Sequence, residues 1–226
     1  MNEKIKKSLL EIREDIKKYS PYPDKVRLVA VTKYSEVDDM LEALGCGADT
    51  FGENKAQLLK EKKTIFDEKN ISNVHWHFIG NLQSNKVKYI IDYVELIHSV
   101  NRLSLAQEIN DQAKKHDRIV NILLEVNIYG EESKEGYDID QLKRDAEALT
   151  KMKNINIIGL MTMAPFTEDQ KILHYVFSEL SKLKDHLNER YFKNELTELS
   201  MGMSNDYKIA LEEGATLIRV GSKIFK

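Results

Sequence analysis

The sequence is poor in cysteine, proline and long apolar runs, and each shortage narrows the class of protein. Its one cysteine, Cys46, cannot form a disulfide within the chain, which fits a reducing compartment, and we expect a cytoplasmic protein. The three prolines mark no linker and no low-complexity tract is present, so we expect a single domain over residues 1–226. No stretch of about 18 apolar residues occurs, so we expect no membrane-spanning helix.

Positive and negative charges are nearly balanced in the sequence, and this argues against two classes of binding partner. The formal net charge of −3 gives no basis for binding nucleic acid or an anionic membrane. Near the N-terminus, apolar side chains recur at helical spacing with charges between them, which predicts a helix packed on the domain; a helix lying on a membrane surface is the alternative. The segment has no apolar core of 7–15 residues, so it is not a secretory signal.

Strand-like apolar runs alternate with helical patterns along the chain. This alternation predicts a (β/α)8 TIM barrel with an added N-terminal helix. An open doubly wound sheet is the rival, although it often has a glycine-rich first turn that this sequence lacks. We expect Gly47 and Gly214 to end helices in the left-handed conformation. The predicted strands are 27–31, 49–51, 74–79, 94–97, 119–127, 155–160, 198–201 and 216–220, and the helices between them are 36–44, 55–68, 84–91, 102–116, 140–152, 168–190 and 206–213.

Common catalytic and metal motifs are missing. There is no Walker A loop, no G-x-G-x-x-G and no G-x-S-x-G. His75 and His77 fall on one face of a strand and could begin a zinc site, but no further ligand follows at a recognisable spacing. We therefore assign no metal ligand and no catalytic residue.

Lys33 is the first candidate for chemistry, because it follows the buried run "RLVAVT" at the end of the first predicted strand. In a barrel the active face lies at the carboxyl ends of the strands. A lysine confined there loses its proton more easily and can attack an aldehyde or ketone. The alternative is an ordinary solvated lysine in a loop.

The last two strands suggest a phosphate site. Ser204 stands at a predicted helix start, and Gly221 and Ser222 follow the last strand with free backbone N–H groups. Phosphate sites recur after strands seven and eight of such barrels, although ordinary capping and turn chemistry is the alternative. Arg219, inside the last strand, must either pair with a core carboxylate or reach into a pocket.

Several motifs together resemble the pyridoxal phosphate (PLP) homeostasis protein family, whose members are single-domain barrels similar to the N-terminal domain of alanine racemase. They are "LVAVTKYS", "FGENKAQ", "WHFIGNLQSNK", "HSV", "EESKEG", "GLMTMAP", "SMGMSNDY" and "GATLIRVGSKIF". The resemblance implies that Lys33 holds PLP as an internal aldimine and that Arg219 faces the pyridine nitrogen. It further implies a PLP site whose other members are Asn54, His77, Ser200, Ser204, Gly221 and Ser222.

Three functions compete. The first is a PLP carrier that keeps the cofactor without substrate turnover and hands it to apo-enzymes, and we favour it. The second is a PLP-dependent amino-acid racemase, which needs acid–base groups on both ring faces. Alanine racemase takes one of these from a further domain that we do not find here. The third is an aldolase that uses Lys33 without cofactor. We expect a monomer that binds neither nucleic acid nor membrane.

Overall fold

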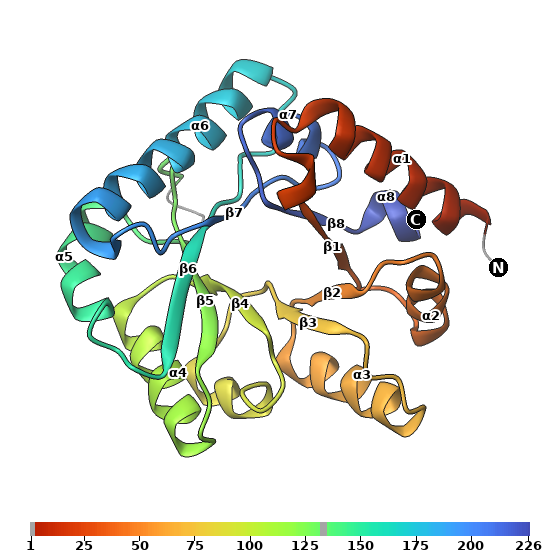
Figure 1. Cartoon of the computed structure of the whole chain (residues 1–226), viewed down its shortest axis with the longest axis horizontal. Helices are drawn as coiled ribbons and strands as arrows, with labels where there is room; N and C mark the ends of the chain where they lie inside the picture. Colours follow the sequence, from red (N-terminus) through yellow and green to blue (C-terminus); the bar gives the residue numbers. More distant parts are fainter. Residues whose placement is uncertain (1–2, 132–134) are drawn as a thin grey trace.

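The chain folds as a closed eight-stranded parallel barrel with helices around it (Figure 1). This computed structural model describes residues 3–131 and 135–226. The strands pair in sequence order and β8 returns to pair with β1. That last pairing confirms the predicted TIM barrel and excludes the open sheet. The strands are β1 (Arg27–Val31), β2 (Thr50–Glu53), β3 (His75–Phe78), β4 (Leu96–Val100), β5 (Val120–Glu125), β6 (Ile155–Met161), β7 (Glu198–Ser200) and β8 (Leu217–Val220).

The helices lie on the outside of the barrel, where their apolar faces cover the strands (Figure 1). The N-terminal helix α1 (Glu3–Tyr19) buries Ile5, Leu9, Ile12 and Ile16, as its spacing predicts. Gly47 and Gly214 have φ of +82° and +88°, so both adopt the left-handed conformation expected of them. The other α-helices are α2 (Val37–Gly45), α3 (Ala56–Glu68), α4 (Leu103–Lys115), α5 (Ile139–Leu149), α6 (Gln170–Leu187), α7 (Tyr207–Glu212) and α8 (Ser222–Phe225).

Two helical predictions need correction. Residues 84–91 form no α-helix: Ser84–Tyr89 is a 3₁₀ helix, η2. The tighter winding places Val87 and Ile90 three residues apart on one edge, and both are fully buried. The helix predicted over 168–190 ends as α6 at Leu187 and continues as a π-helical turn, η3 (Asn188–Phe192).

The remaining short element is the 3₁₀ turn η1 (Pro23–Lys25), which leads from α1 into β1. In the described part of the chain, no helix has both the length and the apolar character needed to cross a bilayer.

The barrel interior is not wholly apolar. A small cluster of Val29, Leu96, Leu123, Met161 and Leu217 fills one layer. Other inward positions carry buried polar side chains, among them His77, His98, Ser200 and Arg219. Burying a polar group destabilises the folded state unless the group is hydrogen-bonded. The contacts that these four polar side chains make with one another are therefore important for the stability of the barrel interior.

Candidate functional site

A cavity of about 610 Å³ opens at the carboxyl ends of the strands. This is the face on which barrels of this kind place their sites, and the volume suits a small cofactor. Six of the eight predicted site residues line it. They are Lys33, Asn54, Ser204, Arg219, Gly221 and Ser222.

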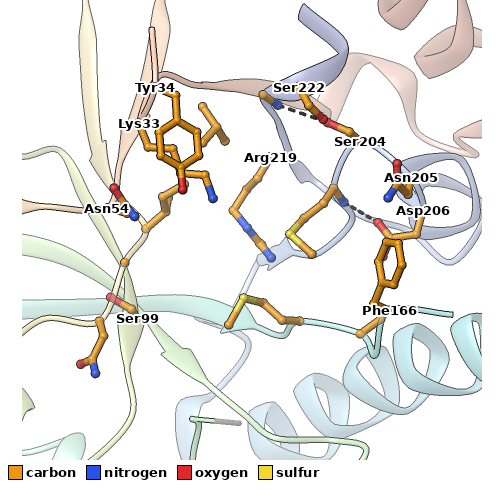
Figure 2. Close-up of a pocket in the computed structure, with 18 of the residues that line it drawn as sticks. Lys33, Tyr34, Asn54, Ser99, Phe166, Ser204, Asn205, Asp206, Arg219 and Ser222 are labelled. Atoms are coloured by element: carbon orange, nitrogen blue, oxygen red, sulfur yellow. Dashed lines mark hydrogen bonds between the residues drawn. The ribbon is translucent and has the colours of Figure 1, made fainter. Parts of the chain in front are cut away.

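Closure of the barrel brings Lys33 and Arg219 together. Strands β1 and β8 pair in register, with Val29 opposite Arg219. Figure 2 shows the Lys33 amine, from the turn after β1, and the Arg219 guanidinium, from β8, directed into the same space. Residues from the two ends of the sequence thus share one cavity.

Lys33 lies at the open side of this cavity. Its side chain is exposed, so the expectation that burial activates the amine is not supported by its position. Its Nζ atom lies 5.1 Å from the centre of the Tyr34 ring, and the Nζ atom of Lys226 lies 5.3 Å from the same ring. Tyr34 is itself 76% exposed and forms part of the rim. The amine is therefore accessible to a ligand that enters from solvent.

Arg219 is held at the inner wall of the cavity. The residue is only 4% exposed. Its guanidinium donates to Ser200 Oγ at 2.6 Å and to the carbonyl of Thr162 at 3.0 Å. Burial lowers its pKa to about 10, so the group keeps its charge at neutral pH. The cavity thus contains a fixed cation that does not release a proton under ordinary conditions.

A buried carboxyl group, which the sequence analysis did not single out, also lines the cavity. Glu125 ends β5 and is 3% exposed. Burial, partly offset by the positive charge of Arg219, raises its pKa to about 7. Its place at the carboxyl end of a barrel strand is the signal that could have revealed it from the sequence.

The predicted phosphate residues meet at one wall. The backbone N–H groups of Gly221 and Lys223 both point to Ser204 Oγ, each at 3.4 Å. This distance is long for a hydrogen bond, so the two donors are weakly satisfied. A Cβ at Gly221 would lie 3.0 Å from the Val31 carbonyl oxygen, which explains why a residue without a side chain stands there. The start of helix α7 has no side-chain cap, although the sequence predicts one near Ser204. The side chain of Asp206, the residue before α7, instead accepts from the backbone N–H of Met203 at 2.5 Å.

A buried ion pair between Lys62 and Glu53 lies beside the segment that carries Lys33. Lys62 on α3 donates to Glu53 Oε1 at 2.5 Å and to the Thr32 carbonyl at 2.6 Å. Thr32 Oγ1 also donates to Glu53, at 2.8 Å. These contacts tie together the ends of β1 and β2, which carry Lys33 and Asn54. Ser99 on β4 lines the cavity as well, and within the described residues its buried hydroxyl has no hydrogen-bond partner.

His77 and Ser200, predicted as lining residues, are not among those that line the cavity. Both are fully buried inside the barrel, where His98 joins them. The zinc alternative also finds no support in geometry: in residues 3–131 and 135–226, no group of three or more His, Cys, Asp or Glu side chains could hold a metal ion.

Comparison with known proteins gives one consistent assignment. The family model described as alanine racemase, N-terminal domain, matches residues 8–226. The pyridoxal phosphate homeostasis protein of Aquifex aeolicus is 39% identical over 200 residues, which cover 88% of this chain and 86% of that protein. This chain belongs to the pyridoxal phosphate homeostasis protein family.

Solved structures agree with this family membership. PipY of Synechococcus elongatus PCC7942, solved with PLP bound, is 31% identical and has a TM-score of 0.90. The match covers 98% of this chain and 100% of that one. A diaminopimelate decarboxylase from M. jannaschii is 14% identical, with a TM-score of 0.75, and shows a shared fold alone. That match covers 97% of this chain and 59% of the decarboxylase.

Proposed function

We propose that this protein binds PLP in the cavity and acts in PLP homeostasis. The observation that carries the proposal is the meeting of Lys33, Arg219 and the Gly221–Ser222 backbone in one cavity, in a chain of this family. PLP supplies a reactive aldehyde and a ring that can draw electrons from bound amines. The residues present suit it: an accessible amine, a fixed cation and weakly satisfied N–H donors.

Each proposed contact has a physical reason. Lys33 would hold the aldehyde carbon covalently, and its exposed position suits reversible loading. The N–H groups near Gly221, together with the Ser204 hydroxyl, would hold the phosphate, since N–H groups at such turns bind anions. Asn54 and Ser99 would meet polar atoms of the ring. His77 and Ser200 would not touch the cofactor, because they lie in the barrel interior behind the residues that line the cavity.

Arg219 supports a holding role over deep carbanion chemistry. A guanidinium only donates hydrogen bonds and is essentially never deprotonated, so it cannot hand a proton to a pyridine nitrogen. An unprotonated ring is a weaker electron sink. We therefore propose a single PLP-binding unit over residues 1–226, cytoplasmic and monomeric, that keeps PLP without turnover and yields it to apo-enzymes.

Borohydride trapping tests the proposal. Purified protein incubated with PLP should turn yellow, borohydride should bleach the band, and peptide mapping should find the label on Lys33. Lys33→Met should abolish the label. Lys55→Met is the matched control, because Lys55 follows the end of β2 but does not line the cavity. A protein that takes up no PLP, or a label fixed elsewhere, would contradict the proposal.

Glu125 gives the racemase alternative its one specific support. A carboxyl group with a pKa of about 7 can donate or accept a proton near neutral pH. The PLP-loaded protein should therefore be mixed with single L-amino acids, and the D-isomer measured over time. Sustained D-isomer formation that is lost in Glu125→Gln would establish the racemase, whereas none would support the carrier.

A further inference from the structure

A chain of hydrogen-bonded side chains crosses the barrel interior behind Arg219. Arg219 on β8 contacts Ser200 on β7 at 2.6 Å. Ser200 Oγ lies 2.8 Å from His98 Nδ1, and His98 Nε2 lies 3.0 Å from His77 Nδ1. Ser200, His98 and His77 are all fully buried. The chain starts at the cavity and continues towards the amino ends of the strands.

The far end of the chain is a carboxylate. Glu95, directly before β4, has its Oε1 atom 3.8 Å from His77 Nε2, which is too long for a hydrogen bond. Among the described residues the buried His77 Nε2 has no hydrogen-bond partner, so it meets the carboxylate through electrostatics alone. Glu95 is also paired with Arg27 at 2.9 Å and with His75. Arg27 and His75 begin β1 and β3, so Glu95 belongs to the end of the barrel opposite the cavity. Its interaction with His77 outweighs burial and, together with His75, lowers the pKa of Glu95 to about 2. The series of side chains therefore runs from the positive charge of Arg219, at the cavity, to the negative charge of Glu95, at the opposite end of the barrel.

The arginine fixes the direction of the first hydrogen bond. A guanidinium can only donate, so Ser200 Oγ must accept from Arg219. The serine hydrogen then needs an acceptor of its own, and His98 Nδ1 is the contact within reach. If His98 instead donated from Nδ1, the buried serine hydrogen would lose this acceptor, and an unsatisfied buried donor destabilises the folded state.

The same direction continues to Glu95. With Nδ1 accepting, neutral His98 carries its proton on Nε2 and donates to His77 Nδ1. His77 then carries its own proton on Nε2, the atom that faces the Glu95 carboxylate. In the reverse sense a bare nitrogen lone pair would face that carboxylate. The contact with Arg219 through Ser200 and the nearby carboxylate of Glu95 thus favour the same tautomer, with the proton on Nε2 of both His98 and His77.

We propose that Glu95, His77, His98 and Ser200 form a one-directional relay that positions the Arg219 guanidinium in the cavity. These four are positioning residues, since they act on a ligand only through Arg219. Burial lowers the pKa of both histidines, so neither adds a second positive charge behind the arginine. The relay connects the electrostatics of the ligand cavity to a carboxylate at the other end of the barrel.

Nitrogen-15 NMR of the histidines, recorded on the unloaded full-length protein, tests the relay directly. His98 and His77 should both be neutral with the proton on Nε2. In Ser200→Ala the His98 Nδ1 signal should shift and the guanidinium signals of Arg219 should broaden, while Ser200→Thr, which keeps the hydroxyl, should restore both. Thr50→Val removes a buried hydroxyl outside the relay and is the control. A proton on Nδ1 of either histidine, or unchanged signals in Ser200→Ala, would overturn the relay.

A second measurement tests the link to the ligand and rests on the proposed function. Glu95→Gln removes the distant charge, and we expect it to shift the absorption maximum of the PLP-loaded protein, whereas Thr50→Val should not. An unmoved maximum, with the Arg219 signals also unchanged in the unloaded protein, would contradict long-range positioning. If the wild-type protein takes up no PLP, the proposed function fails, and the NMR result still decides the relay.

Discussion

Among the titratable side chains that line the cavity, Glu125 and Arg219 are the two most deeply buried. Arg219 is a fixed cation that keeps its charge across the physiological range. Glu125 has a pKa near 7 and changes charge within that range. A ligand therefore meets a constant positive group and a carboxyl group whose state depends on pH.

Glu125 also makes the stability of the unloaded protein depend on pH. Its pKa rises from 4.5 to about 7 on folding, so the neutral form favours the folded state. This contribution is fully present below pH 4.5 and is lost as the pH rises through about 7; its size is on the order of 3 kcal/mol. In Glu125→Gln this part of the pH dependence should vanish. Urea unfolding of both proteins between pH 4.5 and 8 measures the difference, and parallel curves would refute the assignment.

Position along the strands explains why some site residues could be predicted and others could not. Lys33, Arg219 and Gly221 stand at or near strand ends, where barrel geometry makes side chains converge. Lys62 carries no such signal, because a lysine within a helix usually points to solvent. Its burial depends on Glu53, a contact between separate elements that no local pattern contains.

At the scale of elements, α3 anchors the two strands that carry Lys33 and Asn54. The Lys62 ammonium reaches both the Thr32 carbonyl and the Glu53 carboxylate at the carboxyl ends of β1 and β2. Glu53 is fully buried and Lys62 is 9% exposed. Each charge is therefore tolerated only because of the other.

Breaking this pair from one side should cost more than removing it. Lys62→Met leaves the Glu53 charge buried and unpaired, and we expect a loss of about 3–5 kcal/mol in the free energy of unfolding. The double variant Lys62→Met with Glu53→Gln should recover much of that loss. Urea unfolding of both variants and the wild type provides the comparison. A double variant less stable than Lys62→Met would contradict the account.

Element boundaries show where local patterns stop being sufficient. Strand β1 has the predicted bounds, because its apolar run is clearly delimited. Helix α6 stops early because the Asn188 side chain donates to the Leu196 carbonyl at 2.9 Å and accepts from the Leu196 N–H at 3.0 Å. Lys193 and Asn194 then adopt positive φ and turn the chain back. An asparagine in an otherwise helical pattern does not reveal that partner.

At the scale of the whole molecule, α1 links the two ends of the sequence. It packs against α7 and α8, and the Lys223 ammonium meets Glu11 at 3.0 Å. The Tyr207 hydroxyl also donates to Asp15. Helix α8 directly follows Gly221, so α1 supports the cavity wall from outside.

Shortening a buried side chain in α1 should destabilise the whole barrel, including strands far from α1. Leu9 is fully buried, and Leu9→Ala should lower the free energy of unfolding by about 2–5 kcal/mol. The single tryptophan, Trp76 on β3, packs against both Phe51 and Phe66 beneath α3. If the barrel unfolds as one unit, Trp76 fluorescence and circular dichroism should shift together in this variant. A tryptophan transition that does not move would show independent unfolding of the two regions.

The pairing of β1 with β8 also has a consequence for how the protein is made. On the ribosome Lys33 is synthesised early, whereas Arg219 and Gly221 emerge only with the last strand. Until that strand docks, a nascent chain displays the lysine amine without the guanidinium or the turn at Gly221. Any ligand that needs all three must therefore bind after translation has passed β8, and a prematurely terminated product would carry the amine but lack the pocket.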